Sequence, residues 1–471
     1  MQLVFLTTDV LFLGLIAAAI AYGVYAHRHE HLNAPWREVR RNKMGMSGAV
    51  ILASFLIIGI LDSIHFHPKL DDSAAANGEA QYSTEVLSVF DALATPMRTH
   101  VEKTYSAPFA IYAFAKETIE LDGGKTTRDY PRLLYGGAHL QSLADRPGDL
   151  IKKTLIGIAI GLGFWVSVTL ALALFISLGS KTTFRLILSR MRADGGDTPW
   201  RVILLTLGVV SLLIGLIVSI SPYYHILGTD KVGIDVLFQT LKSIRTGLII
   251  GTLTTLVMLP FAMILGITAG YFKGWVDDVI QYLYTTLSSI PGVLLIAAAA
   301  LILEVYMSRN AESFSSLAAR ADLRLLALCV ILGITSWTGL CRLLRAETLK
   351  LREISFVESA RAFGVSHVTV IARHMVPNVM HIVMISIVLD FSGLVLAEAV
   401  LSYINIGVDP TMESWGNMIN SARLELAREP LVWWSLAAAF VFMFVLVLAA
   451  NVFADAVRDA FDPRLRTVHA H

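Results

Sequence analysis

The chain has 471 residues and a net charge of +1, and only 16% of its residues are charged. Soluble domains carry about 25% charged residues, and here long uncharged stretches alternate with charged ones. This pattern indicates a polytopic membrane protein. No basic block of the kind that binds a phosphate backbone occurs, so no nucleic-acid partner is expected. Cys329 and Cys341, about 18 Å apart along one predicted helix, are expected to be packing residues.

Nine segments are long and apolar enough to cross a hydrocarbon core, which takes about 20 residues per helix. The predicted fold class is therefore all-α, a polytopic bundle of about nine transmembrane helices. The seventh segment is the weakest, because it is short and flanked by Arg324 and Arg342. The segments are residues 3–25, 46–66, 154–177, 202–220, 246–269, 279–303, 325–341, 379–403 and 431–453.

Lys and Arg in the short loops predict the orientation. Basic residues outnumber acidic ones by five to two in loops 27–46 and 178–201, and by six to three in loop 342–378. All three loops are predicted to be cytoplasmic, with the N-terminus outside and the C-terminus inside. The insert at residues 67–151, with eight basic and twelve acidic residues, is then external. No Lys or Arg precedes the first segment, which favours a retained span over a cleaved signal peptide.

The loop at residues 342–378 carries the most informative pattern. Phe356, Ala360 and Phe363 recur at i, i+4 and i+7, which places them on one face of a helix. Gly364 suits the left-handed position at which helices end.

A second helix is expected to follow in the same loop. Ser366 can cap its start, and Pro377 is expected to close it. The residues alone leave two readings open. Such an amphipathic element either lies on the lipid headgroups or docks on a partner.

In the same loop, Glu358-Ser359-Ala360 is followed by Gly364, six residues after the glutamate, and by Pro377, thirteen residues after the glycine. This spacing resembles the Glu-Ala-Ala loop of ABC importer permeases. Ser359 stands where the family usually has alanine. The resemblance implies that the first helix is a coupling helix, which docks in a groove of the ATPase subunit. The implied coupling residues are Phe356, Glu358, Ser359, Ala360, Phe363, Gly364 and Pro377.

Further motifs resemble the dipeptide, oligopeptide and nickel branch of these permeases. Residues 373–378 are similar to the branch's loop ending, and residues 462–466 resemble its C-terminal signature. Ile234 stands where the branch usually has arginine. The resemblance covers about residues 200–471. The external residues to which it gives a structural role are Gly228, Asp230, Asp235, Glu398 and Trp415.

The resemblance divides the chain in two. Residues 201–471 correspond to a six-span permease core, and residues 1–200 form an extension of three spans with the insert at 67–151. Within the insert, residues 71–83 read as a linker. Residues 86–115 show helical periodicity with interleaved aromatics. The insert packs over the membrane surface, contacts a binding protein, or is a structured cap without a direct role.

Asp390 lies in the middle of a predicted span, where ionisable residues are functional candidates. It could line the translocation path and meet a peptide amine, or bond to a neighbouring helix. No residue spacing suggests a metal site. No phosphate-binding loop of the Gly-Lys-Ser/Thr type occurs, so the chain is expected to be a transport subunit and not an enzyme. No cofactor is expected in this chain, and ATP and Mg would be bound by partner subunits.

The leading interpretation is half of an ATP-driven importer in a bacterial inner membrane. The resemblance implies a homologous second permease, two ATP-binding subunits and an external solute-binding protein as partners, besides the lipid bilayer. It implies peptides as substrates, with nickel or another small solute as the alternative. A proton-coupled secondary transporter working through Asp390, or a membrane scaffold or sensor, are readings of a different class. No pair of inverted repeats is evident to support the former.

The charge pattern yields a test of topology. Cysteines introduced at Gly78 and Gly195 should differ in intact cells, because the first position is predicted to be external and the second cytoplasmic. A membrane-impermeant thiol reagent should label only the cysteine at Gly78. Labelling of the cysteine at Gly195 alone would contradict the predicted orientation.

Overall fold

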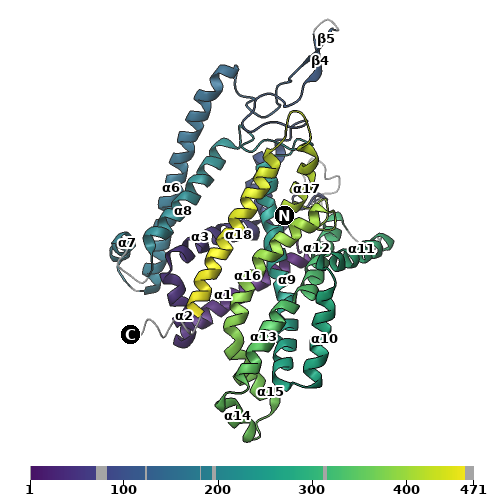
Figure 1. Cartoon of the computed structure of the whole chain (residues 1–471). Helices are drawn as coiled ribbons and strands as arrows, with labels where there is room; N and C mark the ends of the chain where they lie inside the picture. The colour runs from purple at the N-terminus through teal and green to yellow at the C-terminus, as the bar shows by residue number, and fades with distance from the viewer. Residues whose placement is uncertain are drawn as a thin grey trace, which may run out of the picture. The chain divides into compact units, whose positions relative to one another are not determined.

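A computed structural model describes residues 2–69, 82–121, 125–180, 182–193, 198–310 and 316–461 (Figure 1). Most of the predicted linker at 71–83 and the whole motif at 462–466 lie outside these described residues.

The described chain is mostly helical. Two small antiparallel sheets accompany the helices: β1 (Gln2–Val4), β2 (His65–His67) and β3 (Leu87–Ser88) in that order, and the hairpin of β4 (Glu117–Leu121) and β5 (Lys125–Asp129). The helices are α1 (Thr7–Arg28), α2 (Glu30–Arg41), α3 (Lys43–Ser63), α4 (Val89–Leu93), α5 (Thr95–Thr99), α6 (Arg146–Ser180), α7 (Phe184–Ala193), α8 (Trp200–Ile220), α9 (Val236–Phe272), α10 (Trp275–Ser289), α11 (Gly292–Arg309), α12 (Leu317–Ser336), α13 (Thr338–Leu351), α14 (Ser355–Ala362), α15 (His367–Val370), α16 (Val376–Tyr403), α17 (Trp415–Glu425) and α18 (Trp434–Phe461).

Eight stretches of the described chain are long and apolar enough to cross a membrane. They include seven of the nine expected segments and the second part of the sixth, 279–303, so the predicted membrane-spanning helical class is confirmed. The sixth segment is interrupted at Pro291, between the end of α10 and the start of α11, and only α11 qualifies. The expected seventh segment, 325–341, instead divides between α12 and α13 and does not qualify. Arg320, Asp322 and Arg324 charge the first half of α12, which leaves too short an apolar run.

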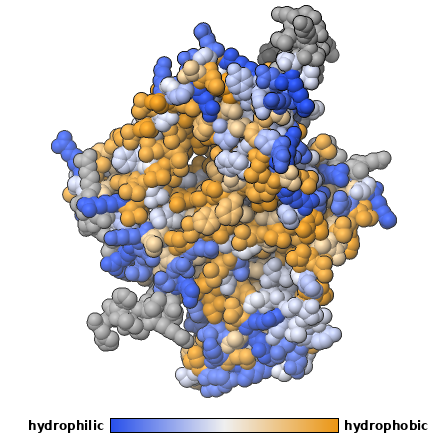
Figure 2. All heavy atoms as spheres, turned by 45° about the horizontal axis from the view of Figure 1, so that its top comes forward, coloured by the Kyte–Doolittle hydropathy of each residue, from blue (hydrophilic) through white to orange (hydrophobic). Residues whose placement is uncertain are grey.

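Large apolar side chains are exposed over much of the face drawn in Figure 2. On α6, Leu155 is 62% exposed, Phe175 76% and Leu178 75%. Contiguous apolar surface of this kind is unfavourable in water, whereas lipid tails are as apolar as these side chains. The surface therefore fits a lipid environment.

The chain folds into two compact units. The first comprises Met1–Val4, Arg40–Thr246 and Glu413–Ala449, and the second comprises Phe5–Val39, Gly247–Met412 and Ala450–His471. Each unit draws on separate parts of the sequence.

In the first unit, α6 and α8 lie side by side along a seam of small residues (Figure 1). A Cβ atom on Gly161 would lie 2.8 Å from the Cα of Leu212, and one on Gly157 would lie 3.0 Å from the Cα of Leu216. Small residues let helix backbones approach closely in a membrane, where no hydrophobic effect drives helices together. At both positions, a larger residue would clash with the backbone of α8, so the close packing requires glycine.

Within the insert, the helix expected over 86–115 is reduced to α4 and α5, each of five residues. Pro108 lacks the N–H of a helix interior, and Phe109 has a φ of 55°, which interrupts helical geometry. Aromatic side chains here pack in an irregular segment. Phe90 and Tyr105, for example, are 8% and 4% exposed.

In the second unit, α9 and α13 make close backbone contact. A Cβ atom on Gly266 would lie 2.7 Å from the carbonyl oxygen of Cys341, and one on Gly270 would lie 2.7 Å from that of Arg345. The same stretch of α13 is tied to α10 by Arg345, whose Nε and Nη2 donate to Asp277 at 2.6 and 2.7 Å.

Two N-terminal helices also pack in the second unit. Thr8, at the start of α1, donates its backbone N–H (3.3 Å) and its hydroxyl to the carboxylate of Asp322 on α12. On α2, Trp36 meets Phe461 of α18 edge-on, with ring centroids 5.5 Å apart. The extension is thus integrated with helices that follow it in sequence.

Candidate functional site

The short helix α14 forms where the sequence predicted a helix, and it ends at the predicted glycine. It ends at Ala362, and Gly364 takes the left-handed conformation with a φ of 74°. The N–H of Val365 donates to the carbonyl of Ala360 at 3.1 Å, and that of Gly364 donates to the carbonyl of Arg361 at 3.0 Å. This is the Schellman hydrogen-bond pattern, which satisfies the last carbonyls of a helix. A Cβ at Gly364 would meet open space, so its backbone conformation is what requires glycine.

The exposed and buried faces of α14 are distinct. Phe363 is 87% exposed and Phe356 is 42% exposed, whereas Val357 is completely buried. Ala360 is partly buried and packs against the same apolar cluster as Val357. The expected face is therefore split: the two phenylalanines are free to meet a partner, and Ala360 also belongs to the protein interior.

Val357 anchors α14 to the membrane helices. It lies in one apolar cluster with Tyr271 of α9, Leu344 of α13 and Val379 of α16. The cluster is densely packed, since Val357, Leu344 and Val379 are fully buried. Packed interiors transmit displacement because they have little free volume.

Polar contacts reinforce this anchor. Arg352 donates from Nη1 to the carbonyl of Tyr271 at 2.9 Å, and the Tyr271 hydroxyl lies 2.8 Å from Nδ1 of His367. Lys273 pairs with Glu353 at 3.0 Å, and this hydrogen bond lowers the pKa of Glu353. The loop before and after α14 is therefore fastened to the end of α9.

Beside Gly364 the surface is hollowed. Glu358, Arg361, Ser366 and His367 line this hollow together with the backbone at Gly364. Glu358 and Ser359 are both exposed. Glu358 lines the hollow, and Ser359 lies next to it on α14. An exposed aromatic side chain next to a polar hollow is a surface suited to a protein partner.

Pro377 does not close the second helix of the loop, which corrects the expectation from the sequence. Ser366 caps α15 by accepting from the N–H of Thr369, but the chain then continues through a π-helical turn, Ile371–Met375, into α16. Pro377 occupies the first turn of α16, where its missing N–H has no partner to lose.

Asp390 and Glu398 lie on α16 in different surroundings. Glu398 is 2% exposed and accepts a hydrogen bond from the hydroxyl of Ser402 at 2.7 Å. Asp390 is half-buried, and no hydrogen bond or ion pair joins it to another described residue. Across the described residues, no His, Cys, Asp and Glu group could hold a metal ion. Glu398 therefore has a hydrogen-bonded partner on its own helix, whereas Asp390 has none among the described residues.

The connection between α8 and α9 is held by its acidic residues. Oδ1 of Asp230 accepts from the N–H groups of Val232 and Ile234, both at 2.9 Å, which closes a tight turn. Asp235 caps α9 by accepting from the N–H of Phe238 at 3.1 Å. These hydrogen bonds account for both Asp230 and Asp235 without any ligand.

Gly228 and Trp415 complete this framework. Gly228 has a φ of 70°, and a Cβ there would collide with the carbonyl oxygen of Ser106. Trp415 is 1% exposed and donates from Nε1 to the carbonyl of Thr240 at 3.1 Å. The α8–α9 connection is therefore shaped to receive the insert, and the first turns of α9 receive the start of α17.

Residues 262–467 match the sequence model of the family described as the binding-protein-dependent transport system inner membrane component. The chain is 31% identical over 245 residues to the glutathione transport system permease protein GsiD of Pectobacterium atrosepticum, covering 52% of this chain and 74% of that protein. It is 31% identical over 244 residues to the oligopeptide transport system permease protein OppC of Mycobacterium tuberculosis, covering 52% and 77%. It is 27% identical over 242 residues to the dipeptide transport system permease protein DppC of Bacillus subtilis, covering 51% and 69%.

The chain belongs to this family of permeases. As such it is a multi-pass inner-membrane component of an ABC transporter and is distinct from the ATPase, so ATP binds to a partner subunit. A binding-protein-dependent system also implies a solute-binding protein as a partner. The match begins at residue 262, which confirms that a long N-terminal extension precedes it.

In this permease the extension contributes a buried charged site that the sequence did not indicate. His225, before α9, lies between two carboxylates: its Nδ1 is 2.8 Å from Asp235, and its Nε2 is 3.4 Å from Glu102 of the insert. Glu102 also accepts three backbone N–H bonds, at 2.8–2.9 Å, from residues 134–136. Only the nearness of His225 to Gly228 in sequence could have drawn attention to it.

The charges at this site are mutually stabilised. Burial opposes protonation of His225, but hydrogen bonds and charge from Asp235 and Glu102 outweigh it and raise its pKa to about 9. Burial would raise the pKa of Glu102, but His225 and the three N–H groups lower it to about 2. An imidazolium between two carboxylates thus fastens the insert to the α8–α9 connection.

This arrangement predicts how docking of the insert depends on pH. His225 titrates at 6.5 when unfolded, so its contribution is complete below pH 6.5 and is lost as the pH rises through about 9. The contribution of Glu102 is complete above pH 4.5 and is lost as the pH falls through about 2. Proteolytic cleavage between residues 102 and 136 of the purified protein should therefore accelerate between pH 7 and about pH 10.

Substitution of the histidine supplies the control for this prediction. The His225→Gln variant should be cleaved faster at neutral pH, and its cleavage rate should depend less on pH. His67→Gln, at a partly exposed histidine whose ring meets the carbonyl of Glu85, should behave as the native protein. An unchanged cleavage rate from pH 6.5 to about 10 in the native protein would contradict the assignment.

Proposed function

We propose that this permease forms half of the translocation pathway of an ATP-driven importer of di- or oligopeptides. A homologous second permease would form the other half of the heterodimer, with two ATP-binding subunits and an external solute-binding protein. The N-terminus would lie outside and the C-terminus in the cytoplasm. Residues 201–471 would form the six-span core, and residues 1–200 the extension.

The observation that carries the mechanism is the division of α14 into two faces. Phe356 and Phe363 are exposed and available to a groove on the ATPase, while Val357 is buried with α9, α13 and α16. Movement of the ATPase would displace α14, and the packed cluster would pass that displacement to the membrane helices. Glu358, Ser359 and Gly364 would lie at the docking surface.

The proposal of peptides as substrates rests on the relatives, whose names specify glutathione, oligopeptides and dipeptides. Nickel or another small solute is the alternative within the same transporter branch. Competition of labelled trialanine uptake by unlabelled peptides, compared with competition by Ni²⁺, separates the two. A proton-coupled transporter would show uptake that survives loss of the ATPase and collapses with the proton gradient.

Coupling can be tested on the exposed face of α14. Phe363→Asp should leave folding and pairing with the second permease intact, because this side chain is 87% exposed. It should abolish substrate-stimulated ATP hydrolysis by the reconstituted complex, because a charge would enter an apolar contact. Gly364→Asp should act similarly, with a backbone cost of about 1 kcal/mol for the left-handed conformation.

The matched control is Ser359→Ala, which removes only a hydroxyl that donates to Ser355 of the same helix. It introduces the alanine usual in the family and should be tolerated. Val357→Thr is unsuitable as a control, because it would bury a hydroxyl in the apolar cluster. Normal stimulated hydrolysis in both aspartate variants would exclude α14 as the coupling element.

Asp390 is proposed as a residue of the translocation path, because it is half-buried in α16 and has no ionic or hydrogen-bonded partner among the described residues. Asp390→Asn should lower peptide uptake several-fold, through loss of its interaction with a peptide amine, and leave assembly with the ATPase unchanged. Glu398→Gln should instead impair assembly, because Glu398 is buried and bonded to Ser402. Unchanged uptake in Asp390→Asn would remove this residue from the path.

A further inference from the structure

The segment 86–114 of the insert contacts three separate stretches of the first unit. It meets the α8–α9 connection with the start of α9, then the region after α17, and then the start of α18. The contacts are of different physical kinds. Taken together, they indicate a role that the permease mechanism does not supply.

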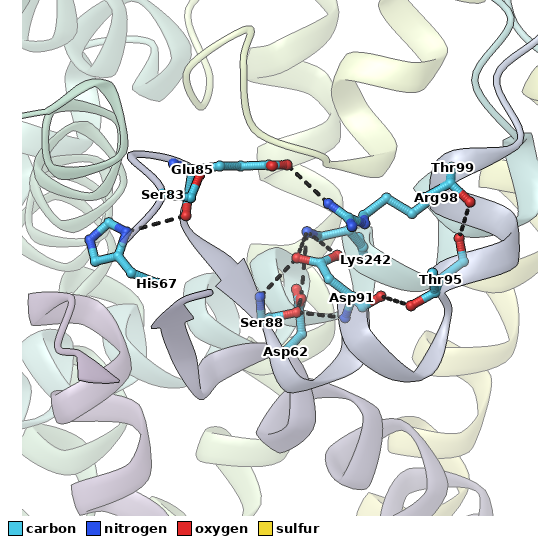
Figure 3. Close-up of polar contacts among 10 residues, drawn as sticks. All are labelled: Asp62, His67, Ser83, Glu85, Ser88, Asp91, Thr95, Arg98, Thr99 and Lys242. Carbon is cyan, nitrogen blue, oxygen red and sulfur yellow. Dashed lines mark hydrogen bonds and ion pairs between the residues drawn. The ribbon is translucent and has the colours of Figure 1, made fainter. Parts of the chain in front are cut away.

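The first contact centres on Lys242 of α9 (Figure 3). Its ammonium lies 2.8 and 3.0 Å from the two carboxylate oxygens of Asp91 in α4. It also lies 3.7 Å from Oδ1 of Asp62 in the last turn of α3. Ser88 connects the two acids, because its hydroxyl donates to Asp62 at 2.7 Å and its N–H donates to Asp91 at 2.9 Å.

Asp62 and Asp91 are more deeply buried than Lys242, so their charges need the lysine more than its charge needs them. The side chains of Asp62 and Asp91 are each 3% exposed, whereas that of Lys242 is 22% exposed. Asp62 also lies at the C-terminal end of a helix, where the helix dipole disfavours a negative charge. Burial would raise the pKa of Asp91, but the charge of Lys242 outweighs it and lowers that pKa. Without Lys242, two buried carboxylates would be left uncompensated.

Apolar contacts flank this charge cluster. Phe90 of α4 stacks on Phe238 of α9, with ring centroids 6.2 Å apart and planes 13° from parallel. At the other end of the segment, Phe114 meets Trp434 of α18 edge-on, with centroids 4.8 Å apart. Both pairs are within the range in which aromatic rings attract beyond simple burial.

Thr229 joins the insert and α18 at one point. Its hydroxyl accepts from the N–H of Ser106 at 2.7 Å and donates to the carbonyl of Thr104 at 2.9 Å. Its own carbonyl accepts from Nε1 of Trp434 at 2.9 Å. Thr229 is completely buried.

The region after α17 is the remaining stretch that the segment contacts. The guanidinium of Arg428 lies 5.1 Å from the ring centroid of Tyr105, within the range of a cation–π interaction. The buried hydroxyl of Tyr105 also bonds to Glu425, and burial with this bond raises its pKa. The segment therefore holds α9, α17 and α18 through independent contacts.

We propose that segment 86–114 is a brace, which ties the start of α9, the end of α17 and the start of α18 into one body. It remains docked on them throughout transport. A movable lid would need at least one weak interface from which it could detach. Here buried charges, stacked rings and backbone hydrogen bonds hold the segment on all three stretches. The segment is then a positioning element for these helix ends.

Charge exchange at Lys242 tests docking without any transported substrate. Lys242→Met should raise the rate of proteolytic cleavage within 86–114 by about tenfold or more, because it leaves two buried carboxylates unpaired. Adding Asp62→Asn and Asp91→Asn to that variant should restore much of the protection, because the two carboxylates that Lys242 pairs with are then uncharged. Glu85→Gln is the control, since the Glu85 side chain is 63% exposed in its pair with Arg98 and should change the rate little.

Two results would contradict the role of Lys242 in docking the segment. One is native protection in Lys242→Met. The other is a triple variant that is cleaved faster than Lys242→Met, because independent losses would then simply multiply.

A cross-link separates a brace from a lid. The hydroxyl oxygens of Ser106 and Thr229 are 3.1 Å apart, so cysteines at the two positions are close enough to form a disulfide. Trialanine uptake, which rests on the proposed function, should be the same in the oxidised and reduced forms of this double variant and in either single-cysteine control. Loss of uptake on oxidation, reversed by reductant, would show that the segment must undock and would overturn the brace.

Discussion

The burial of Val357 against Tyr271, Leu344 and Val379 is the contact on which the proposed coupling depends. One side of an eight-residue helix is fixed in the protein interior, so the other side, with Phe356 and Phe363, is presented in a fixed orientation. A helix this short has little stability of its own. Its geometry comes from tertiary packing and from the glycine that ends it. Lys273, Arg352 and His367 surround the same anchor with polar contacts, which limits rotation about it.

Periodicity and turn chemistry made part of this site predictable. The presence of a helix at α14 follows from the i, i+4 and i+7 pattern, and its end follows from the left-handed preference of Gly364. Most membrane segments follow from uncharged runs of sufficient length. These are local properties, so they can be read without knowing what lies nearby.

Other features depended on partners far away in the sequence. Val357 and Phe356 are both apolar neighbours, and only the packed fold distinguishes the buried one from the exposed one. Pro377 suggests a helix end, yet a π-helical turn before it lets the helix continue. The insert was the least predictable part, because Glu102, Asp91 and Phe90 act through residues more than a hundred positions away. Their local sequence contains no sign of His225, Lys242 or Phe238.

The glycines between α9 and α13 carry a mechanical consequence. At Gly266 and Gly270 the separation of the two helices is set by backbone atoms and not by side chains that can change rotamer. Two rods in contact along their length resist flexing far more than either rod alone. A displacement at one end of the paired helices α9 and α13 therefore moves the other end and does not bend the helices. If α14 couples to the ATPase as proposed, Gly266 and Gly270 stiffen the pair of helices through which its displacement would pass.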